Sequence, residues 1–540
     1  MTRCFDYVIV GAGSSGATLA ARLSEDPSVS VCLIEAGPRD THPAISIPLG
    51  LIWLSKHPKL NWLYTSTAQE GLGGRQVSVP RGKVLGGSSS INGMIYIRGQ
   101  AADYDGWAAQ GCAGWSFDDV LPYFMRSEGN SAPGVDPTFH GSDGPLSVQR
   151  LTDPSPMNDV FIEAAGQLQY RQTRDFNGAD QEGVGVYQVT QSGGSRMSTA
   201  HAFLKNTQTR PNLHIETDAV VSEVVMSEAT AQAVRLKRND GQTEDIEARI
   251  EIILSAGAIG SPELLLRSGI GPGPHLRACG IAVHTALPGV GANLQDHVDC
   301  MVICESTSRT PYGISMAGLP RLSWEGLRYV FGRRGMLSSN MVEGGGFIRS
   351  APDQDQPDLQ FHFIPGRKSH RGKMLEWGHG VSLHTCVLRP KSRGSLTLDP
   401  SRVDGDPLID LGLLRHEDDL RLLTKGVGIA REILRQDPFK PHGLTEILPG
   451  KAVDDDDLES FVRANARTVY HPVGTCAMGT GPDAVTDPNL RVHGVQNLRV
   501  VDASIMPTIV SGNTNAPAIM IAEKAADLIA TDRRARTKAA

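Results

Sequence analysis

The chain has 540 residues, of which 40% are hydrophobic and 21% charged, and its formal net charge is −7 at pH 7. A chain this long exceeds what one hydrophobic core supports, so two or more domains are expected. The acidic balance gives no reason to expect nucleic acid as a partner, and no run of about 18 apolar residues predicts a membrane-spanning helix.

Motifs for several other chemistries are missing from the sequence. The eight cysteines are scattered and form no CxxC pair, so neither a metal site nor an iron–sulfur site is predicted. The sequence has no Walker-type phosphate loop and no HExxH, which removes support for nucleotide hydrolysis and zinc peptidase chemistry. Residues 1–6 lead almost directly into the first strand without the apolar stretch of a secretory signal, so a cytoplasmic protein is expected.

The first expected elements are a strand, a glycine turn and a helix. An apolar strand over residues 5–10 runs into the turn at residues 11–16, and an alanine- and leucine-rich helix follows. A second apolar strand, over residues 29–34, ends on Glu35. This order of strand, GxGxxG, helix, strand and terminal acid is typical of a dinucleotide-binding unit.

Each residue type in this unit has a physical task. Gly11 allows the tight turn, Gly13 lets the backbone approach a pyrophosphate, and Gly16 lets the helix pack close to the strand. The helix N-terminus offers free N–H groups to the phosphates. Glu35 lies where an acid would meet a ribose hydroxyl, and it argues against NADP because it would repel the extra phosphate. NAD and FAD both remain possible at this point.

The next 220 residues or so contain three informative stretches. Residues 36–80 look irregular, whereas the Gly/Ser-rich residues 81–94 carry apolar neighbours and are predicted to line a ligand rather than to form a flexible loop. Residues 213–254 are predicted to form strands, with a buried strand over 250–254. Residues 261–263, Ser-Pro-Glu, are typical of a helix start.

A different pattern occupies residues 303–465. Apolar and polar residues alternate over 359–363 and 395–398, which predicts antiparallel strands with one solvent-exposed face. A helix is expected over 418–434, and another is expected to begin at the acidic run 454–457, which is interpreted as a solvated helix start rather than a metal site.

The C-terminal part repeats the pattern of the N-terminus. A buried strand is expected over 497–501, and it ends on Asp502 and Ala503. A polar loop over 511–515 follows, and Pro517 is expected to open a helix that continues to about residue 529. A strand-end acid, a polar loop and a proline-started helix predict a second edge that faces the ligand.

Taken together, these segments resemble the glucose–methanol–choline (GMC) family of FAD-dependent oxidoreductases, especially its choline dehydrogenase-like group with the bacterial aliphatic-alcohol and sorbose dehydrogenases. The resemblance covers nearly the whole chain, and its motifs beyond the glycine turn are residues 81–99, 257–271, 288–297, 470–475 and 501–513. It implies an α/β chain, α+β overall, with a Rossmann-like FAD-binding domain and a discontinuous substrate domain built on an antiparallel sheet.

The resemblance also implies a division of the chain. Residues 5–302 are expected to form the FAD-binding segment, with an irregular insert at about 36–80 and an excursion into the substrate domain at about 150–200. Residues 303–465 are expected to be mainly substrate-binding, and residues 466–531 to return to the FAD domain with the catalytic residues.

FAD rather than NAD is the cofactor that the resemblance implies. Some family members carry a histidine that bonds covalently to the flavin, and the matching position here is Ile91, so non-covalent FAD is expected. The residues implied to hold the cofactor are Gly11, Gly13, Ser14, Ser15, Gly16, Glu35, Ala36, Gly86, Asn92, Gly93, Met94, Val221, Ala256, Asp502, Ala503, Asn513 and Thr514.

His471 is the candidate general base, because imidazole titrates near neutral pH and the residue lies in a family motif. Asn513 is its candidate partner and is implied to occupy the place of the family's second His/Asn, while His297 is interpreted as structural. The candidate substrate residues are Glu343, Phe361, His362, Phe363 and Tyr470.

The predicted reaction is FAD-dependent oxidation of a primary alcohol to an aldehyde. Apolar residues such as Ile95, Met341 and Val342 favour a medium- or long-chain aliphatic alcohol over a polyol or sugar alcohol, with choline third. A non-oxidative flavoprotein lyase and a flavin-binding protein without turnover are the alternatives of another class, and retention of His471 and Asn513 argues against both.

The electron acceptor is left open among a quinone, a carrier and oxygen. The short basic tail at residues 533–538 could touch an anionic membrane at its inner face, although a solvated terminus is the more ordinary interpretation.

Overall fold

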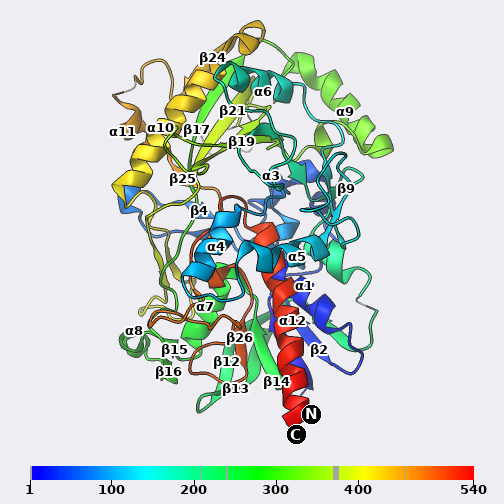
Figure 1. Ribbon diagram of the computed structural model, residues 1–540, viewed down its shortest axis with the longest axis vertical. Coiled ribbons are helices and arrows are strands. Elements are labelled where there is room, and N and C mark those ends of the chain that lie inside the picture. The colour runs from blue at the N-terminus through cyan, green and yellow to red at the C-terminus, as the bar shows by residue number, and fades with distance from the viewer. Residues whose placement is uncertain (1–2, 208, 239–240, 369–375, 455, 540) are drawn as a thin grey trace.

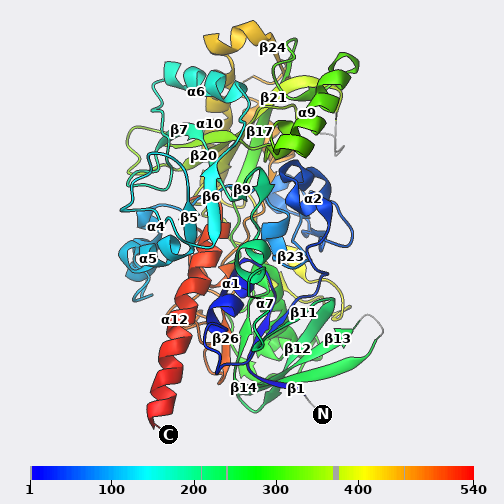
Figure 2. The ribbon, with the colours of Figure 1, turned by 90° about the vertical axis from the view of Figure 1, so that its right-hand side faces the viewer.

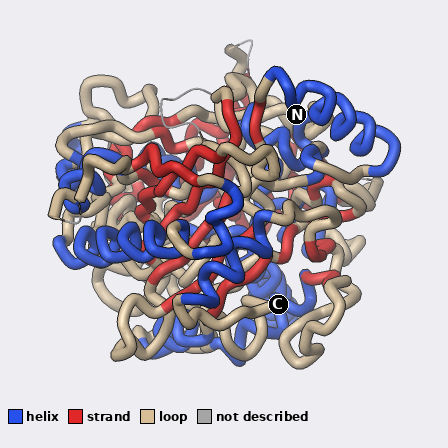
Figure 3. The backbone as a smooth tube through the Cα atoms, turned by 90° about the horizontal axis from the view of Figure 1, so that it is seen from above, coloured by secondary structure: helices blue, strands red, loops and turns tan. Residues whose placement is uncertain are grey.

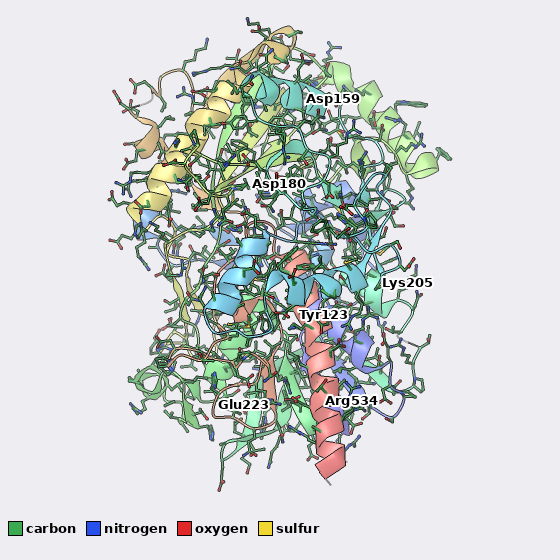
Figure 4. The ribbon with its side chains drawn as sticks, viewed as in Figure 1. Tyr123, Asp159, Asp180, Lys205, Glu223 and Arg534 are labelled. Atoms are coloured by element: carbon green, nitrogen blue, oxygen red, sulfur yellow. The ribbon has the colours of Figure 1, made fainter. Side chains whose placement is uncertain are left out.

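The computed structural model describes residues 3–207, 209–238, 241–368, 376–454 and 456–539. Two sheets occupy the two halves of the elongated molecule, as Figure 1 shows. Asp159 on α6 (Met157–Gln167) and Glu223 on β12 (Ala219–Ser227) mark these halves in Figure 4. In the part of the chain that the structure describes, no helix is long and apolar enough to cross a membrane.

The lower sheet combines a parallel core with an antiparallel hairpin. Its strands run in the order β11-β2-β1-β14-β13-β12, and β26 pairs with β14 beside β13. The core strands are short apolar runs that are buried on both faces, as expected for a parallel sheet covered by helices. The remaining strands of this sheet are β1 (Arg3–Val10), β2 (Val31–Ile34), β11 (Leu213–Glu216), β13 (Thr230–Arg238), β14 (Thr243–Leu254) and β26 (Leu498–Val500).

Helices from both ends of the chain cover this sheet together. Helix α12 (Asn515–Ala539) packs against α1 (Ser14–Leu23) and α5 (Phe117–Ser127), and Figure 2 shows α12 beside α1 along the lower half. The buried carboxylate of Glu523 on α12 accepts hydrogen bonds from Arg22 at 2.8 Å and from Arg126 at 2.7 Å. Segments near the two ends of the chain therefore pack against each other beside this sheet.

Helix α7 (Gly257–Arg267) differs from the sequence prediction. The expected start at residues 261–263 is wrong, because the helix begins earlier and Pro262 lies inside it. Proline has no N–H, so the carbonyl of Ala258 loses its helical partner. The hydroxyl of Thr475 donates to that carbonyl at 2.7 Å and takes the place of the missing bond.

The upper sheet is antiparallel and carries helix α10 (Glu417–Leu434) on one face. In β20 (Leu359–Ile364) the alternation is present, but the expected solvent-exposed face is wrong because every residue of the strand is buried. One face packs Phe363 against Phe161, and the other carries His362, which lines a cavity, and Gln360, which bonds to Asn513. The other strands of this sheet are β7 (Gly183–Val186), β17 (Val298–Ser306), β18 (Gly313–Ile314), β19 (Gly344–Ile348), β21 (Gly378–Val387), β24 (Leu444–Leu448) and β25 (Arg467–Thr468).

Short elements complete the molecule, and Figure 3 shows helices lying mostly around strands that gather toward the middle. Residues 239 and 240, within the stretch predicted to form strands, lie outside the described residues. The further helices are α2 (Pro43–Ser46), α3 (Leu51–Leu54), α4 (Ala101–Ala109), α8 (Gly273–Ala278), α9 (Leu319–Gly332) and α11 (Leu458–Asn465). The further strands are β3 (Tyr64–Thr65), β4 (Ser78–Val79), β5 (Glu128–Asn130), β6 (Leu146–Arg150), β8 (Gln188–Val189), β9 (Gln191–Ser192), β10 (Ser195–Arg196), β15 (Ile270–Gly271), β16 (Thr285–Ala286), β22 (Ser395–Thr397) and β23 (Leu408–Asp410).

Candidate active site

One cavity of about 670 Å³ takes its lining from both sheets. Gly11 and Ala256 follow the carboxyl ends of β1 and β14, and both line the cavity. Asp299 of β17 and His384 of β21 line it from the upper sheet. Ligand sites in open α/β sheets lie at such strand ends, so this cavity is the candidate active site.

The glycine turn brings bare backbone to the cavity. A Cβ on Gly16 would lie 1.8 Å from the carbonyl oxygen of Gly11, so this glycine permits close packing of α1 on the turn. A Cβ on Gly13 would meet only Gly87 Cα, at 4.0 Å, and Gly13 itself lines the cavity. Gly13 is the N-cap of α1 and gives it no side-chain cap, so the first-turn N–H groups remain available to an anionic ligand.

Glu35 lines the same end of the cavity. Its carboxylate accepts hydrogen bonds from the backbone N–H groups of Ala12 at 3.0 Å and Gly37 at 2.9 Å. Burial raises the pKa of this carboxyl to about 7, although the two hydrogen bonds act to lower that pKa. The side chain is thereby held in place at the cavity wall, which suits the ribose contact predicted for it.

Most of the residues predicted to hold a cofactor line the cavity, and two do not. Gly16 serves helix packing, and Gly86, at φ +88°, forms the turn before the 310 segment Gly87–Ser90. The predicted residues that line the cavity are Gly11, Gly13, Ser14, Ser15, Glu35, Ala36, Asn92, Gly93, Met94, Val221, Ala256, Asp502, Ala503, Asn513 and Thr514.

The buried guanidinium of Arg196 holds the loop that contains Asn92, and the sequence analysis missed it. Arg196 Nη1 donates to the Asn92 carbonyl at 2.7 Å, to the Asn92 side-chain oxygen at 2.8 Å and to the Ser89 carbonyl at 3.1 Å. Burial lowers the pKa of Arg196 to about 9. Arg196 lies in a polar stretch of β10, and its partners are about a hundred residues away in the sequence. No local pattern therefore indicated this role.

The residues present fit a dinucleotide cofactor. The cavity volume of about 670 Å³ lies in the usual range for cofactor sites. Beside Gly93 and Gly257 an added Cβ would meet nothing within 4 Å, so the backbone at both positions stays open to a ligand. Uncapped N–H groups at one end and a buried acid next to them match a pyrophosphate and a ribose.

Two histidines and an asparagine meet at the cavity, and their hydrogen bonds show which ring nitrogens of the histidines carry protons. His297 Nε2 donates to the carbonyl oxygen of Leu388 at 3.0 Å, so in the neutral ring Nδ1 is an acceptor. His471 Nδ1 lies 3.0 Å from that atom and must be the donor. His471 Nε2 is then unprotonated, and it accepts from Asn513 Nδ2 at 3.2 Å. This arrangement leaves a basic nitrogen directed into the cavity.

Gln360 fixes the orientation of the asparagine. Its Nε2 donates to Asn513 Oδ1 at 3.2 Å, which turns the Asn513 amide nitrogen toward His471. The sequence analysis did not select Gln360. The alternation of β20 was the available signal, because it places Gln360 on the same face as His362.

The ionisation of both histidines agrees with this assignment. Burial lowers the pKa of His471 well below its ordinary value, and the neighbouring His297 and His362 lower it further. Burial lowers the pKa of His297 to about 4. Both rings are therefore neutral at neutral pH, as the shared hydrogen bond requires.

We expect His297 to act as a positioning residue for His471. In His297→Phe the His471 Nδ1–H loses its acceptor, so kcat should fall roughly tenfold to a hundredfold, the value of one hydrogen bond to a developing charge, while KM changes little. His297→Gln offers an acceptor and a donor in the same places and should recover part of the rate. Steady-state kinetics of both variants test this, and equal losses in both would contradict it.

A charged cluster on the upper sheet forms the opposite wall. His384 Nδ1 donates to the Asp299 carboxylate, and Lys368 donates to His384 Nε2 at 3.3 Å. Arg467 Nε lies 3.8 Å from Asp299 Oδ1, and within the described part of the chain neither atom has a hydrogen-bond partner. Burial lowers the pKa of Lys368 to about 8, which leaves it protonated at neutral pH. The sequence analysis missed all four residues because they converge from four separate segments.

The predicted substrate residues separate into two groups. His362 and Tyr470 line the cavity. Phe361 and Phe363 do not, because they lie on the core face of β20. Glu343 is fully buried outside the cavity lining, where its carboxylate accepts bonds from Ser155, Asn158, Ser339 and Tyr312. The Glu343 carboxylate thus joins three segments of the chain, at residues 155–158, 312 and 339–343.

Comparison with known proteins gives a consistent result over the whole chain. Residues 5–299 and 390–522 match the N- and C-terminal family models described as GMC oxidoreductase. The chain is 46% identical over 527 residues to an alcohol dehydrogenase [acceptor] of Pseudomonas putida, covering 97% of this chain and 95% of the relative. It is 42% identical to an oxygen-dependent choline dehydrogenase of Rhizobium johnstonii, with the same coverage. The crystal structure of pyridoxine 4-oxidase from Mesorbium loti superposes with a TM-score of 0.85 at 32% identity, covering 97% and 98% of the two chains.

Proposed function

The chain belongs to the GMC oxidoreductase family of FAD-dependent alcohol oxidoreductases, and we propose that its reaction is the oxidation of a primary alcohol to an aldehyde with His471 as the base. The observation that carries this proposal is the unprotonated Nε2 of His471 beside Asn513 in the cofactor cavity. A neutral amide next to that atom orients an alcohol without competing for its proton.

In the proposed mechanism the alcohol hydroxyl lies between His471 and Asn513. His471 Nε2 accepts the hydroxyl proton, and His297 stabilises the resulting imidazolium by accepting its Nδ1–H. The Asn513 amide donates to the alcohol oxygen as negative charge develops there. The bound FAD supplies the hydride acceptor.

Glu35 and Val221 would hold the adenosine half of FAD, the first turn of α1 its phosphates, and Asn92, Met94 and Thr514 the flavin. Ile91 lines the cavity at the position that in some members bonds to the flavin, and its aliphatic side chain offers no atom for that bond. This supports non-covalent binding.

The cavity lining supports an aliphatic chain on one side. Leu51, Met94, Ile95 and Val342 line it and provide an apolar wall. We propose a medium- or long-chain primary alcohol whose alkyl part lies along these residues.

A polyol or sugar alcohol is the second candidate, and one observation favours it. Asp299 Oδ1 and Arg467 Nε face each other in the cavity wall without hydrogen-bond partners among the described residues, and hydroxyl groups would satisfy both. Choline is disfavoured, because the cations Lys368 and Arg467 lie in the same wall and would repel a quaternary ammonium group.

An alcohol panel tests the proposed function. The FAD-loaded protein is mixed anaerobically with alkanols, polyols and choline, and flavin bleaching is followed together with the aldehyde formed. Bleaching with stoichiometric aldehyde supports the proposal, whereas a lyase or a flavin-binding protein would give none. The active alcohol is then turned over with oxygen, a quinone analogue and a soluble dye in parallel, which identifies the acceptor.

The pH dependence of the wild-type enzyme provides a further test. The pKa of His471 lies well below about 6.5, so the neutral base persists as the pH falls through that value. We therefore expect kcat/KM to stay on its plateau through pH 6.5 and to fall only at lower pH. Initial rates at limiting alcohol over about pH 5 to 8 measure this, and an acidic limb centred near 7 would contradict the assignment.

A further inference from the structure

Helix α9 turns its apolar side away from the protein. Trp324, Leu327, Val330 and Phe331 are 61%, 50%, 69% and 85% exposed. Their spacing of three, six and seven residues places them on one face of the helix. A surface helix ordinarily buries such a stripe against the core, so this orientation is inverted.

Polar contacts on the inner side hold the helix in this orientation. The Glu325 carboxylate accepts the Met336 N–H at 3.0 Å. Arg328 donates to the Asp153 carboxylate at 2.6 Å, and Asp153 also accepts the Gly335 N–H at 3.0 Å. The outward apolar face is therefore a fixed feature of the fold.

Two large apolar residues outside the helix enlarge the apolar surface. Met316 precedes α9 and is 72% exposed. Trp377 is 62% exposed and is bridged to Ile314 of β18, two residues before Met316. Monomeric soluble proteins rarely expose so many large apolar side chains together, and such patches mark an interaction site.

Cations flank this surface at both ends of the helix. Arg321 lies near the start of α9, and Arg333 and Arg334 follow its end; all three are exposed. Among the described residues no carboxylate forms an ion pair with any of them, although the whole chain carries a net charge of −7. The local excess of positive charge thus opposes the charge of the protein as a whole.

We propose that α9 is an interfacial helix that rests on an anionic lipid bilayer. An apolar stripe with tryptophan and phenylalanine, flanked by arginines, has the two properties that interfacial binding uses, namely buried apolar area and attraction to anionic lipid. With 14 residues the helix is about 21 Å long, which suits a position in the plane of the interface.

Helix α9 lies far from the basic tail, which the sequence analysis considered as a membrane contact but interpreted as a solvated terminus. Figures 1 and 2 show α9 in the upper half of the molecule and the end of α12 at the bottom. Arg534, labelled in Figure 4, lies near that lower end. A bilayer against α9 would leave the basic tail in solvent.

The chain leads directly from α9 to the cavity wall. After the 310 segment Met336–Ser338, the Asn340 side chain donates to the Gly93 carbonyl at 2.8 Å, and Gly93 and Val342 line the cavity. The lipid-facing surface and the substrate site are therefore neighbours along the chain.

Vesicle co-sedimentation of the full-length, FAD-loaded protein tests the proposal. Phosphatidylcholine vesicles with roughly one third phosphatidylglycerol should bind the wild type, less so at high salt. Leu327→Gln/Phe331→Gln should lower the partition coefficient by at least about tenfold. Arg333→Gln/Arg334→Gln should lower it by about fivefold per arginine on these vesicles and leave weak binding to pure phosphatidylcholine unchanged.

Two controls separate α9 from general surface effects. Leu408→Gln removes another exposed apolar side chain, 38% exposed on β23, and Arg534→Gln/Arg536→Gln removes charge from the tail. Both should bind vesicles like the wild type. The α9 variants should keep their flavin content and their alcohol-dependent reduction of a soluble dye, which shows that they are folded.

Three results would overturn the proposal. The wild type does not sediment with anionic vesicles at low salt, or the tail variant loses binding while the α9 variants keep it. The third is a wild-type dimer, seen by size-exclusion chromatography with light scattering, that Leu327→Gln/Phe331→Gln dissociates. That result would assign the surface to a second copy of the chain.

Discussion

His471→Ala should lower the rate of flavin reduction by the alcohol roughly 10²- to 10⁴-fold while the protein keeps its FAD. The substitution removes His471 Nε2. The hydrogen bonds with His297 and Asn513 leave this nitrogen unprotonated, and it is directed into the cavity. Alanine leaves room for a water molecule, which accepts a proton far less readily than imidazole. The rate is measured by anaerobic rapid mixing with the best alcohol of the panel.

An exposed histidine provides the control for this loss. His284 is exposed, and His284→Ala should reduce flavin at the wild-type rate. Flavin absorbance per mole of protein checks that the His471 variant still carries cofactor. A His471→Ala protein that bleaches as fast as the wild type would remove His471 from the role of base.

Gly13→Val should give a folded protein that does not retain FAD. Gly13 has φ −75° and ψ −160°, an extended conformation that valine adopts readily, and its Cβ would meet only Gly87 Cα at 4.0 Å. The branched methyl groups would stand over the first turn of α1, where the phosphates must approach. Loss of two charge-assisted hydrogen bonds, each about 1.5–3 kcal/mol, would weaken FAD binding at least about a hundredfold.

Isothermal titration of flavin-stripped protein with FAD measures this loss, and circular dichroism checks the fold. Gly106→Val is the matched control, because a Cβ there meets nothing within 4 Å and Gly106 lies on α4, outside the cavity lining. Gly16→Ala makes a different point, since its Cβ would collide with the Gly11 carbonyl and should destabilise the domain itself. Stoichiometric FAD in purified Gly13→Val would contradict the prediction.

The sequence predicted best what local patterns determine. The strand, glycine turn and helix at residues 5–23 and the acid at Glu35 were readable from periodicity and glycine spacing. The helix expected over 418–434 is α10, whose acidic first turn and apolar stripe lie within one segment. The fold class and the family are confirmed, whereas the domain limits at residues 302 and 465 stay predictions.

Long-range contacts account for what the sequence did not reveal. Gln360 touches Asn513 across 153 residues, and His297 touches His471 across 174, so neither partnership leaves a local signal. The start of α7 was predicted too far along the chain, because Pro262 was taken as the first turn of the helix. The hydroxyl of Thr475 bonds to the Ala258 carbonyl that Pro262 leaves without a partner, and this contact spans 217 residues. The sequence analysis made no prediction for α9, and only the fold shows that the apolar side of this helix points outward.

The pairing of the first and last helices has a consequence for how the protein is made. Strand β26 joins β14, and Glu523 on α12 is buried against Arg22 and Arg126 only after the ribosome has synthesised almost the entire chain. The parallel sheet cannot be completed before its final strand and the helix that covers it have been synthesised, so apolar edges stay uncovered until then. We therefore expect the nascent chain to bind chaperones until about its last forty residues, which contain β26 and α12, have been synthesised.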